Sequence, residues 1–291
     1  MKTLAVHLHI YYTDMLPKIL QYLKNLEGLE YDLYVTMVTE NKEVESKIKS
    51  FNKDADIKVV ENRGYDIGPF IDFLHRIDLS NYKYILKVHT KGTKSNNYTH
   101  LNGNRLDNAL WGRILWDSML SSSSRIRDNI KELDKNDKAG MIGSAYCHTN
   151  ELKDYQKLLP QINENLVKMG FSEIEKLSFI AGSMFLCRAN LLQPLTMFKL
   201  DDFAPTDGKI KEGTLAHIVE RLLCVIITSQ NYKIKGIKHT TEKLEKIYDN
   251  YSLRFFVTSV CRFLFQKKVT RSGKRLIKIC KIPVYSKQIE S

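Results

Sequence analysis

Between residues 4 and 88, short apolar runs alternate with segments in which apolar residues recur every three or four positions. The runs predict four strands, at Leu4–Tyr12, Tyr31–Val38, Ile57–Val60 and Tyr82–Val88. Helices are expected between them, from Thr13 or Asp14 to Gly28, up to about Phe51, and from Pro69 to Arg76. Strands that alternate with helices through short links predict a mostly parallel sheet with helices on both faces.

The later pattern extends the same α/β domain. The polar stretch THLNGNRLDN (99–108) predicts a loop that orders over a ligand, and a helix follows, with Leu110 and Met119 on its apolar side. Further strands are expected at Ala139–Tyr146, Ser178–Cys187 and Tyr232–Ile237, and helices at Glu151–Gly170, with a break at Pro160, and Thr214–Cys224. We therefore expect one domain over residues 1–245 and a separate tail over residues 246–291.

Charged and hydrogen-bonding residues directly follow two of the predicted strands. Residues 61–66 (ENRGYD) come after Val60, and residues 89–91 (HTK) come after Val88. Ligands of open α/β sheets bind at the carboxyl ends of strands, and His and Lys there suit an anion. Two simpler explanations remain open: a tight strand-to-helix turn for the glycines of GYDIG (64–68), and a solvated basic strand end for residues 89–91. GYDIG matches neither glycine-rich phosphate motif.

The positive charge of the chain lies mainly in its tail. Of the net +12, residues 251–291 contribute ten Lys or Arg against one acid, Glu290. The other residues are nearly balanced, which is not the pattern of a nucleic-acid-binding domain. Between Phe255 and Ile282 basic and apolar residues interleave, so a basic amphipathic helix is expected to bind an anionic membrane surface. Docking on the main domain or on a partner protein is the alternative.

The composition excludes several other classes of protein. The five cysteines are widely spaced and lie mostly in apolar runs, which fits reduced thiols in the cytoplasm better than disulfides or a zinc site. The apolar run near residue 1 is too short for a signal peptide, and no window of eighteen uncharged apolar residues occurs. We expect a cytoplasmic protein, peripherally associated with the inner face of the cell membrane.

Six segments together resemble a known family. They are VHLHIYY (6–12), NRGYDIGPF (62–70), YILKVHTKGT (84–93), Trp111 with its helix, AGSMFLCRA (181–189) and GTLAHIVERL (213–222). The chain resembles the rhamnan synthesis F family of bacterial polysaccharide glycosyltransferases over roughly residues 3–240. The resemblance implies a GT-A-like, Rossmann-related fold and a nucleotide-diphosphosugar transferase, rhamnosyltransferase-like or another hexosyl- or deoxyhexosyltransferase. It would act on lipopolysaccharide or another cell-surface polysaccharide.

The strand end at His89 predicts a donor site without a metal. Many nucleotide-sugar enzymes with such a sheet carry an Asp-x-Asp pair here, whose oxygens hold a divalent cation on the diphosphate. This chain has HTK instead, and His and Lys supply donors and positive charge directly. We therefore predict no required cofactor and a nucleotide-diphosphosugar as substrate.

The candidate site residues divide by expected role. Those expected to line the nucleotide are His9, Tyr11, Thr39 and Asp66, and those facing the diphosphate are Arg63, His89, Lys91 and His239. A transferase that inverts a sugar centre needs a carboxylate to accept the proton of the acceptor hydroxyl. Glu212 is the predicted general base, with Asp207 as competitor, although the carboxylate of Glu212 also suits a helix start for electrostatic reasons alone.

The expected acceptor is a hydroxyl of a lipid-linked cell-surface glycan, such as a polysaccharide, O-antigen or lipooligosaccharide. The alternative from another functional class is a non-catalytic nucleotide-sugar or glycan-binding subunit of a polysaccharide synthase complex. Hydrolysis of the donor by the isolated protein separates the two, because a binding subunit would hold the donor without cleaving it.

Overall fold

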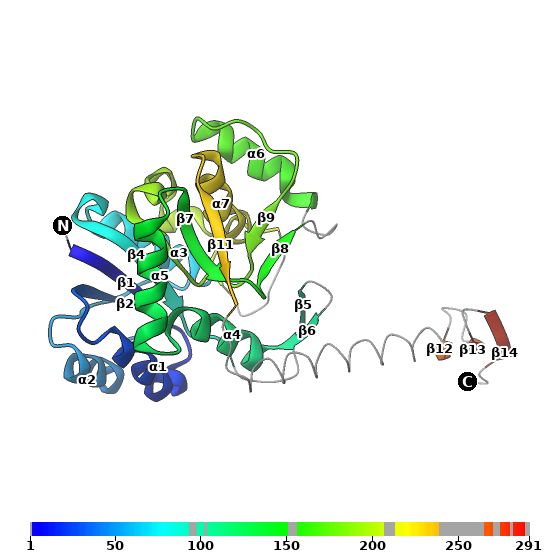
Figure 1. The fold of residues 1–291 in the computed structure, drawn as a ribbon. Helices are drawn as coiled ribbons and strands as arrows, with labels where there is room; N and C mark the ends of the chain where they lie inside the picture. Colours follow the sequence, from blue (N-terminus) through cyan, green and yellow to red (C-terminus); the bar gives the residue numbers. More distant parts are fainter. Residues whose placement is uncertain are drawn as a thin grey trace. The chain divides into compact units, whose positions relative to one another are not determined.

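A seven-stranded sheet forms the centre of the larger of two compact units (Figure 1). The computed structural model describes residues 2–92, 98–101, 104–150, 156–206, 213–238, 265–269, 274–279 and 282–288. The larger unit comprises residues 1–97 and 107–239, and the smaller comprises 98–106 and 240–291. The two units are not two consecutive stretches of sequence, since the smaller unit includes residues 98–106 as well as residues 240–291.

The first half of the sheet confirms the predicted alternation of strands and helices. In order along the chain, the elements are β1 (Lys2–Ile10), α1 (Leu16–Leu23), β2 (Tyr31–Met37), α2 (Lys42–Phe51), β3 (Asp56–Val59), α3 (Ile67–Arg76) and β4 (Tyr82–His89). β1 pairs in parallel with both β2 and β4, and β2 pairs in parallel with β3. β1 and β4 are almost continuously buried, as expected for central strands covered on both faces.

The second half completes the sheet in the order β11-β7-β10-β4-β1-β2-β3. Its elements are α4 (Asn108–Leu120), α5 (Ser123–Lys135), β7 (Ala139–Ser144), β8 (His148–Asn150), α6 (Leu159–Lys168), β9 (Ser178–Ile180), β10 (Phe185–Arg188), α7 (Leu215–Ser229) and β11 (Lys233–Ile237). β10 runs antiparallel to both of its neighbours, so the sheet is mostly parallel.

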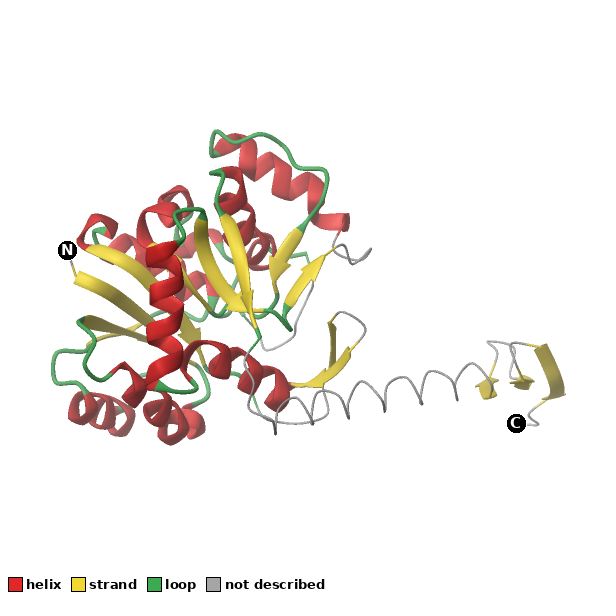
Figure 2. Cartoon of the chain, in the orientation of Figure 1, coloured by secondary structure: helices red, strands yellow, loops and turns green. Residues whose placement is uncertain are grey.

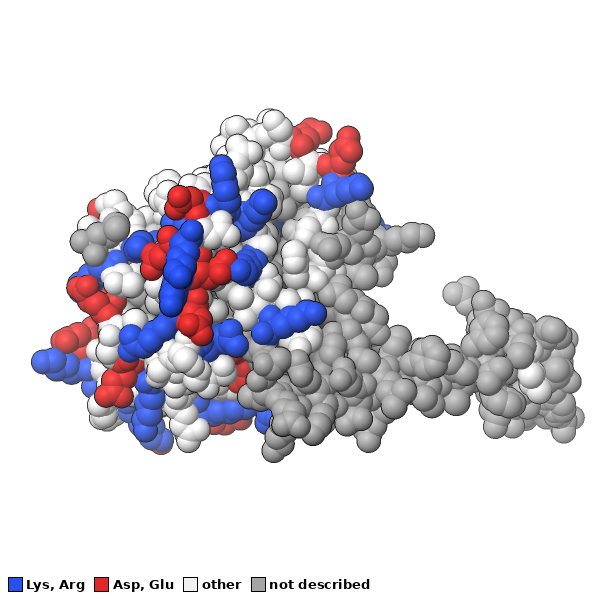
Figure 3. Space-filling model, viewed as in Figure 1, with Lys and Arg blue, Asp and Glu red and all other residues white. Residues whose placement is uncertain are grey.

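Helices cover both faces of this sheet (Figure 2). On one face α1 contacts α2 and α4, and α5 packs against α4, β7 and β10. On the other face α3 contacts α7 and the short helical segment Ala189–Met197, and α7 packs against β7 and β11. On the surface around α5, basic and acidic side chains are interspersed (Figure 3), and Lys83 and Lys235 form ion pairs there with Asp134 and Glu132.

Three local predictions in the larger unit need correction. The expected strand at Ser178–Cys187 is two strands, β9 and β10, separated by a turn in which Gly182 and Ser183 have φ of 96° and 52°. Pro160 lies in the first turn of α6 instead of breaking it, because a proline there forgoes no intrahelical hydrogen bond. Helix α5 was not predicted at all.

The smaller unit differs from the expected loop and helical tail. β5 (Tyr98–Leu101) and β6 (Asn104–Asp107) form a two-stranded sheet within the predicted polar loop. β12 (Phe265–Val269), β13 (Lys274–Ile279) and β14 (Ile282–Gln288) form an antiparallel sheet, so the predicted helix is wrong for these residues. Pro283 and the many β-branched residues near it favour strand over helix. Residues 246–264 of the predicted tail lie outside the described residues.

Candidate functional site

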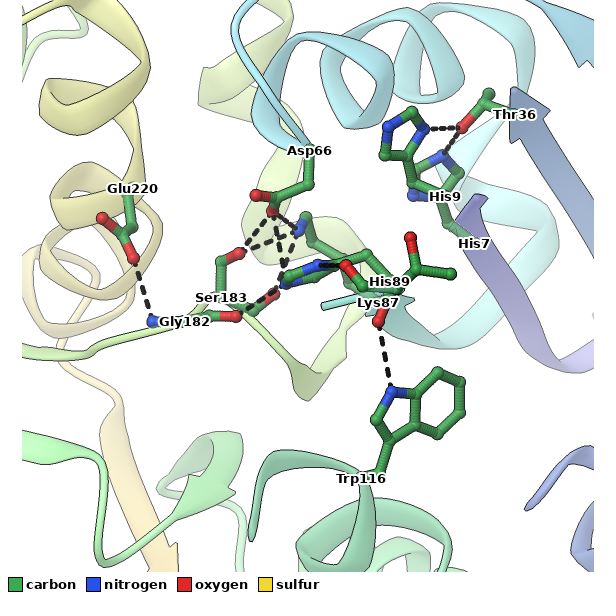
Figure 4. A network of polar contacts seen from close by, with 11 residues as sticks. His7, His9, Thr36, Asp66, Lys87, His89, Trp116, Gly182, Ser183 and Glu220 are labelled. Carbon is green, nitrogen blue, oxygen red and sulfur yellow. Dashed lines mark hydrogen bonds and ion pairs between the residues drawn. The ribbon is translucent and has the colours of Figure 1, made fainter. Parts of the chain in front are cut away.

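The direction in which successive strands are added to the sheet reverses between β1 and β4. From β1 the chain adds β2 and β3 on one side, then returns with β4 on the other side of β1. In open α/β sheets such a switch point, at the carboxyl ends of the strands, is where ligands bind. His9 of β1 pairs in register with Thr36 of β2 and with His89 of β4, so three polar residues meet at this edge. Figure 4 shows the polar network around them.

A buried ion pair between Asp66 and Lys87 is the centre of this network. Lys87 projects from β4 with a side chain that is 0% exposed, and its Nζ lies 2.5 Å from Oδ2 of Asp66, at the start of α3. The Ser183 hydroxyl donates to the same oxygen at 2.5 Å and accepts from Lys87 at 3.1 Å. Lys87 also donates to the Ser183 carbonyl oxygen at 3.1 Å, so the buried ammonium is fully engaged.

The charge of Asp66 depends on these partners. Burial acts to raise the pKa of the Asp66 carboxyl, but His89, Lys87 and the Ser183 hydroxyl together hold that pKa well below its usual range. Asp66 is therefore ionised at neutral pH. Because Lys87 balances this carboxylate at contact distance, Asp66 leaves no net negative charge at the strand ends.

His89 lies beside the ion pair with its ring enclosed. Nδ1 is 2.9 Å from the Thr90 carbonyl oxygen, and Nε2 is 2.9 Å from the Gly182 carbonyl oxygen and 3.6 Å from Asp66. The two carbonyls favour a doubly protonated ring, whereas burial lowers the pKa of His89 to about 4. Lys87 already neutralises Asp66 from a shorter distance, so burial prevails and the ring is neutral near pH 7, donating through one nitrogen. The Trp116 indole donates to the His89 carbonyl oxygen at 3.1 Å.

A strained turn joins three elements at this point. Gly182 donates its N–H to Glu220 of α7 at 2.9 Å and accepts from His89, while Ser183 contacts both Asp66 and Lys87. Ser183 has φ of 52°, and Tyr65, the residue before Asp66, has φ of 58°. Non-glycine residues adopt this left-handed conformation at a free-energy cost, and such residues cluster at functional sites.

The strain at Ser183 gives a testable pair of variants. Ser183→Ala should lower the free energy of unfolding by about 1.5–3 kcal/mol, because it removes a hydrogen bond to a buried carboxylate. Ser183→Gly loses the same bond but relieves the left-handed backbone, so it should be less destabilised by about 1 kcal/mol. Urea unfolding at pH 7 measures both. A Gly variant less stable than the Ala variant would show that Ser183 is not strained.

A second polar group connects β1 and β2. Nε2 of His7 and Nδ1 of His9 each lie 3.0 Å from the Thr36 hydroxyl oxygen. The side chains of His7, His9 and Thr36 are at most 3% exposed, and the His7 ring stacks on Phe73 at 4.8 Å. Burial lowers the pKa of both rings, that of His9 to about 3, so both are neutral near pH 7.

Lys91 and two tyrosines lie beyond the ends of the central strands. The Lys91 ammonium is 3.3 Å from the centre of the Trp111 ring, and burial lowers the pKa of Lys91. The Thr90 hydroxyl accepts from the backbone N–H groups of Tyr11 and Tyr12 at 2.8 and 3.0 Å, which fixes the chain where it leaves β1. Both tyrosine side chains are 42% exposed.

The predicted site residues have different surroundings. His9 and His89 lie near the ends of β1 and β4, and Lys91 follows β4, as expected. Asp66 lies at the start of α3, after the edge strand β3, and both Asp66 and His89 are engaged inside the network. Arg63 donates to Glu61 at 2.6 Å and to the Phe203 carbonyl oxygen at 2.9 Å. Thr39 is exposed beyond the end of β2, and Tyr11 is exposed beyond β1. The remaining predicted residues, Asp207, Glu212 and His239, lie outside the described residues.

Sequence reasoning gave no role to His7, Thr36, Lys87, Ser183 or Glu220. The position of Lys87 within a predicted buried strand does indicate a buried ion pair, since a lysine in an apolar strand needs a countercharge. His7 and His9 also alternate on one face of a predicted strand, where polar side chains require partners. Nothing local indicates Ser183, which meets Asp66 across 117 positions of sequence.

The fold and this edge define a class of protein: a mostly parallel α/β protein whose candidate ligand site lies at the switch point of the sheet. The chain belongs to the rhamnan synthesis protein F family (RgpF), whose sequence model matches residues 1–232. The family predicted from the motifs is therefore confirmed.

The comparisons also give relatives and similar structures. WxcX, an uncharacterised protein of Xanthomonas campestris pv. campestris, is 28% identical over 241 residues in each of two strains. The match covers 81% of this chain, which spans about a third (33%) of the length of these relatives. 

Similar solved structures have lower sequence identity to this chain. S. aureus TarS 1-349 is 10% identical, with a TM-score of 0.42 over 82% of this chain and 58% of that chain. Glucosyl-3-phosphoglycerate synthase from Mycobacterium tuberculosis, in complex with Mn2+, uridine diphosphate and phosphoglyceric acid, is 10% identical, with a TM-score of 0.37 over 99% and 89%.

In the part of the chain that the structure describes, no helix is long and apolar enough to cross a membrane. Among the same residues, no three or more His, Cys, Asp and Glu side chains come together in a way that could hold a metal ion.

Proposed function

We propose that this chain is a GT-A-like glycosyltransferase that moves a sugar from a nucleotide-diphosphosugar to a hydroxyl of a lipid-linked cell-surface glycan. The proposal rests on one structural observation above all: the desolvated Asp66–Lys87–Ser183 network at the switch point, in which Ser183 and the neighbouring Tyr65 have left-handed backbones. Membership of the rhamnan synthesis protein F family supports the connection to polysaccharide synthesis. Buried charges and backbone strain held together at a strand edge are typical of functional sites.

The diphosphate is assigned to Lys91 as its direct partner. Asp66 is balanced by Lys87 at 2.5 Å, so the positive charge of Lys91 is available to an anion at the end of β4. His89 supports the site from within, because both ring nitrogens face backbone carbonyls. The predicted general base, Glu212 with Asp207 as competitor, and the predicted contact His239 remain parts of the proposal. So does attachment of the basic residues after 250 to the inner membrane surface.

A thermal-shift screen across nucleotide sugars tests the proposal. A ligand that binds only the folded state raises the apparent melting temperature, and the stabilisation grows with the logarithm of its concentration over its dissociation constant. At least one nucleotide-diphosphosugar should stabilise the protein, and the isolated protein should hydrolyse it slowly. Stabilisation without hydrolysis or transfer would favour a non-catalytic binding subunit, and the absence of stabilisation by any nucleotide sugar would refute a donor site.

Lys91→Met should weaken donor binding by about tenfold or more, because a charge-assisted contact to phosphate is lost. The fold should be little affected, since no carboxylate lies at contact distance from Lys91 among the described residues. The matched control is Lys83→Met, which removes a lysine from the opposite end of β4. Equal donor affinity in both variants, measured by titration calorimetry, would remove Lys91 from the diphosphate site.

Sugar transfer is expected to proceed fully in excess chelator, because the basic strand end at residues 89–91 replaces an acidic metal-binding pair. Transfer rates should therefore agree with and without EDTA. Activity that disappears in EDTA and returns with Mn2+ would show that the donor diphosphate needs a metal ion.

A further inference from the structure

The Thr36 hydroxyl lies between two neutral histidines, and a hydroxyl has only one hydrogen to donate. Among the described residues these two rings are the only hydrogen-bond partners of the hydroxyl, so it donates its hydrogen to one ring and accepts from the other (Figure 4). The direction of these two hydrogen bonds decides which nitrogen of His9 carries a proton. It thus decides whether His9 offers a donor or an acceptor to anything bound beside it.

The surroundings of His7 set the direction. Nδ1 of His7 is buried and has no hydrogen-bond partner among the described residues, and the ring packs against Phe70 and Phe73. A proton on that nitrogen would be a buried donor without an acceptor, which is among the rarest and most costly arrangements in proteins. The proton of His7 is therefore on Nε2, and His7 donates to the oxygen of Thr36.

The direction of the second hydrogen bond, between Thr36 and His9, follows from this step. Thr36 accepts from His7, so its own hydrogen points to Nδ1 of His9, which is 3.0 Å away. Nδ1 of His9 is then the acceptor, and the single proton of this neutral ring is on Nε2. Among the described residues, Nε2 of His9 makes no hydrogen bond, so the Nε2–H is left for a ligand.

We infer that His7 and Thr36 are positioning residues that fix His9 as a neutral N–H donor for an uncharged acceptor oxygen of the donor's nucleoside, such as a base carbonyl. This inference rests on the proposed function and deepens it. A neutral donor suits a carbonyl, whereas the cation at Lys91 suits the phosphates, so the two strand ends divide the ligand between them. Thr36 would act on affinity only through the tautomer of His9.

The test compares Thr36→Val, which keeps the shape of the side chain and removes the hydroxyl, with Thr36→Ser, which keeps the hydroxyl. Each full-length variant is titrated with UDP, dTDP, GDP and CDP, and with inorganic pyrophosphate. For the nucleotide that the wild type binds best, Thr36→Val should bind about three- to tenfold more weakly, the effect of one neutral hydrogen bond. Thr36→Ser should stay within about twofold, and pyrophosphate affinity should be the same in all three proteins.

A spectroscopic measurement tests the chain of hydrogen bonds without any ligand. In long-range 1H–15N spectra of histidine-labelled wild type, His7 and His9 should both be protonated at Nε2, and Thr36→Val should give His9 a mixture of tautomers. Protonation of His9 at Nδ1 in the wild type would overturn the inference, as would an equal loss of nucleotide and pyrophosphate affinity in Thr36→Val. If the wild type binds none of the four nucleotides, the proposed donor site and the ligand assigned to His9 both fail, while the spectrum still decides the tautomer.

Discussion

Lys87→Met is expected to lower the free energy of unfolding by about 3–5 kcal/mol, because it leaves the Asp66 carboxylate buried without its cation. Lys87 is 0% exposed and Asp66 is 20% exposed, so water cannot replace the lost partner effectively. Methionine has nearly the length of lysine, so the change tests charge more than packing. Urea unfolding at pH 7 measures the difference.

Two control variants distinguish the loss of the ion pair from a general disruption of the sheet. Lys87→Met combined with Asp66→Asn should be more stable than Lys87→Met alone by about 2 kcal/mol, since the uncompensated charge is gone. Lys58→Met removes an ion pair with Asp72 in which the lysine is 43% exposed, and it should cost at most about 1 kcal/mol. If Lys87→Met is no worse than Lys58→Met, Asp66 does not depend on Lys87.

The part of the fold that sequence predicts best is the first half of the sheet. There, each strand is a compact apolar run and each helix has a clear period, so local pattern and tertiary burial agree. β1 to β4 and the helices between them follow the predicted order with boundaries shifted by a few residues.

The segment after Leu177 shows why local pattern is not sufficient. SFIAGSMFLC (178–187) reads as one apolar strand, yet the backbone turns at Gly182 and Ser183 because contacts with Glu220, His89 and Asp66 hold it there. Those partners come from three other elements, and their contacts overcome the strand propensity of the run. The small residues at 181–183 were the one local sign of a turn.

The same limit applies to the candidate site. The residue types at the strand ends indicated an edge suited to an anion, and the sheet order brings those ends together. Whether a side chain faces a ligand or the protein is a matter of tertiary contacts, however. His89 was expected to touch the diphosphate directly, but its ring nitrogens face Thr90 and Gly182, which the sequence does not reveal.

Acidification from pH 7 to pH 4.5 is expected to destabilise the protein steeply, and His9 alone should account for about 2.5 kcal/mol of the loss. In the unfolded chain His9 titrates near pH 6.5, whereas burial lowers its pKa in the folded protein to about 3. Below pH 6.5 the unfolded state therefore binds a proton that the folded state does not, so the stability falls as the pH falls. His7 and His89, whose pKa values burial also lowers, act in the same direction.

These histidines and Asp66 affect the stability of the protein over different pH ranges. The pKa of Asp66 is depressed by its partners, so its contribution is present above about pH 4 and is lost only below that. His9→Asn places an amide where Nδ1 contacts Thr36 and removes the titrating group. Urea unfolding of this variant between pH 7 and 4.5 should show a loss smaller by about 2.5 kcal/mol than in the wild type. An unchanged slope would mean that His9 takes up a proton in the folded protein, and it could then no longer serve as the neutral donor assigned to it.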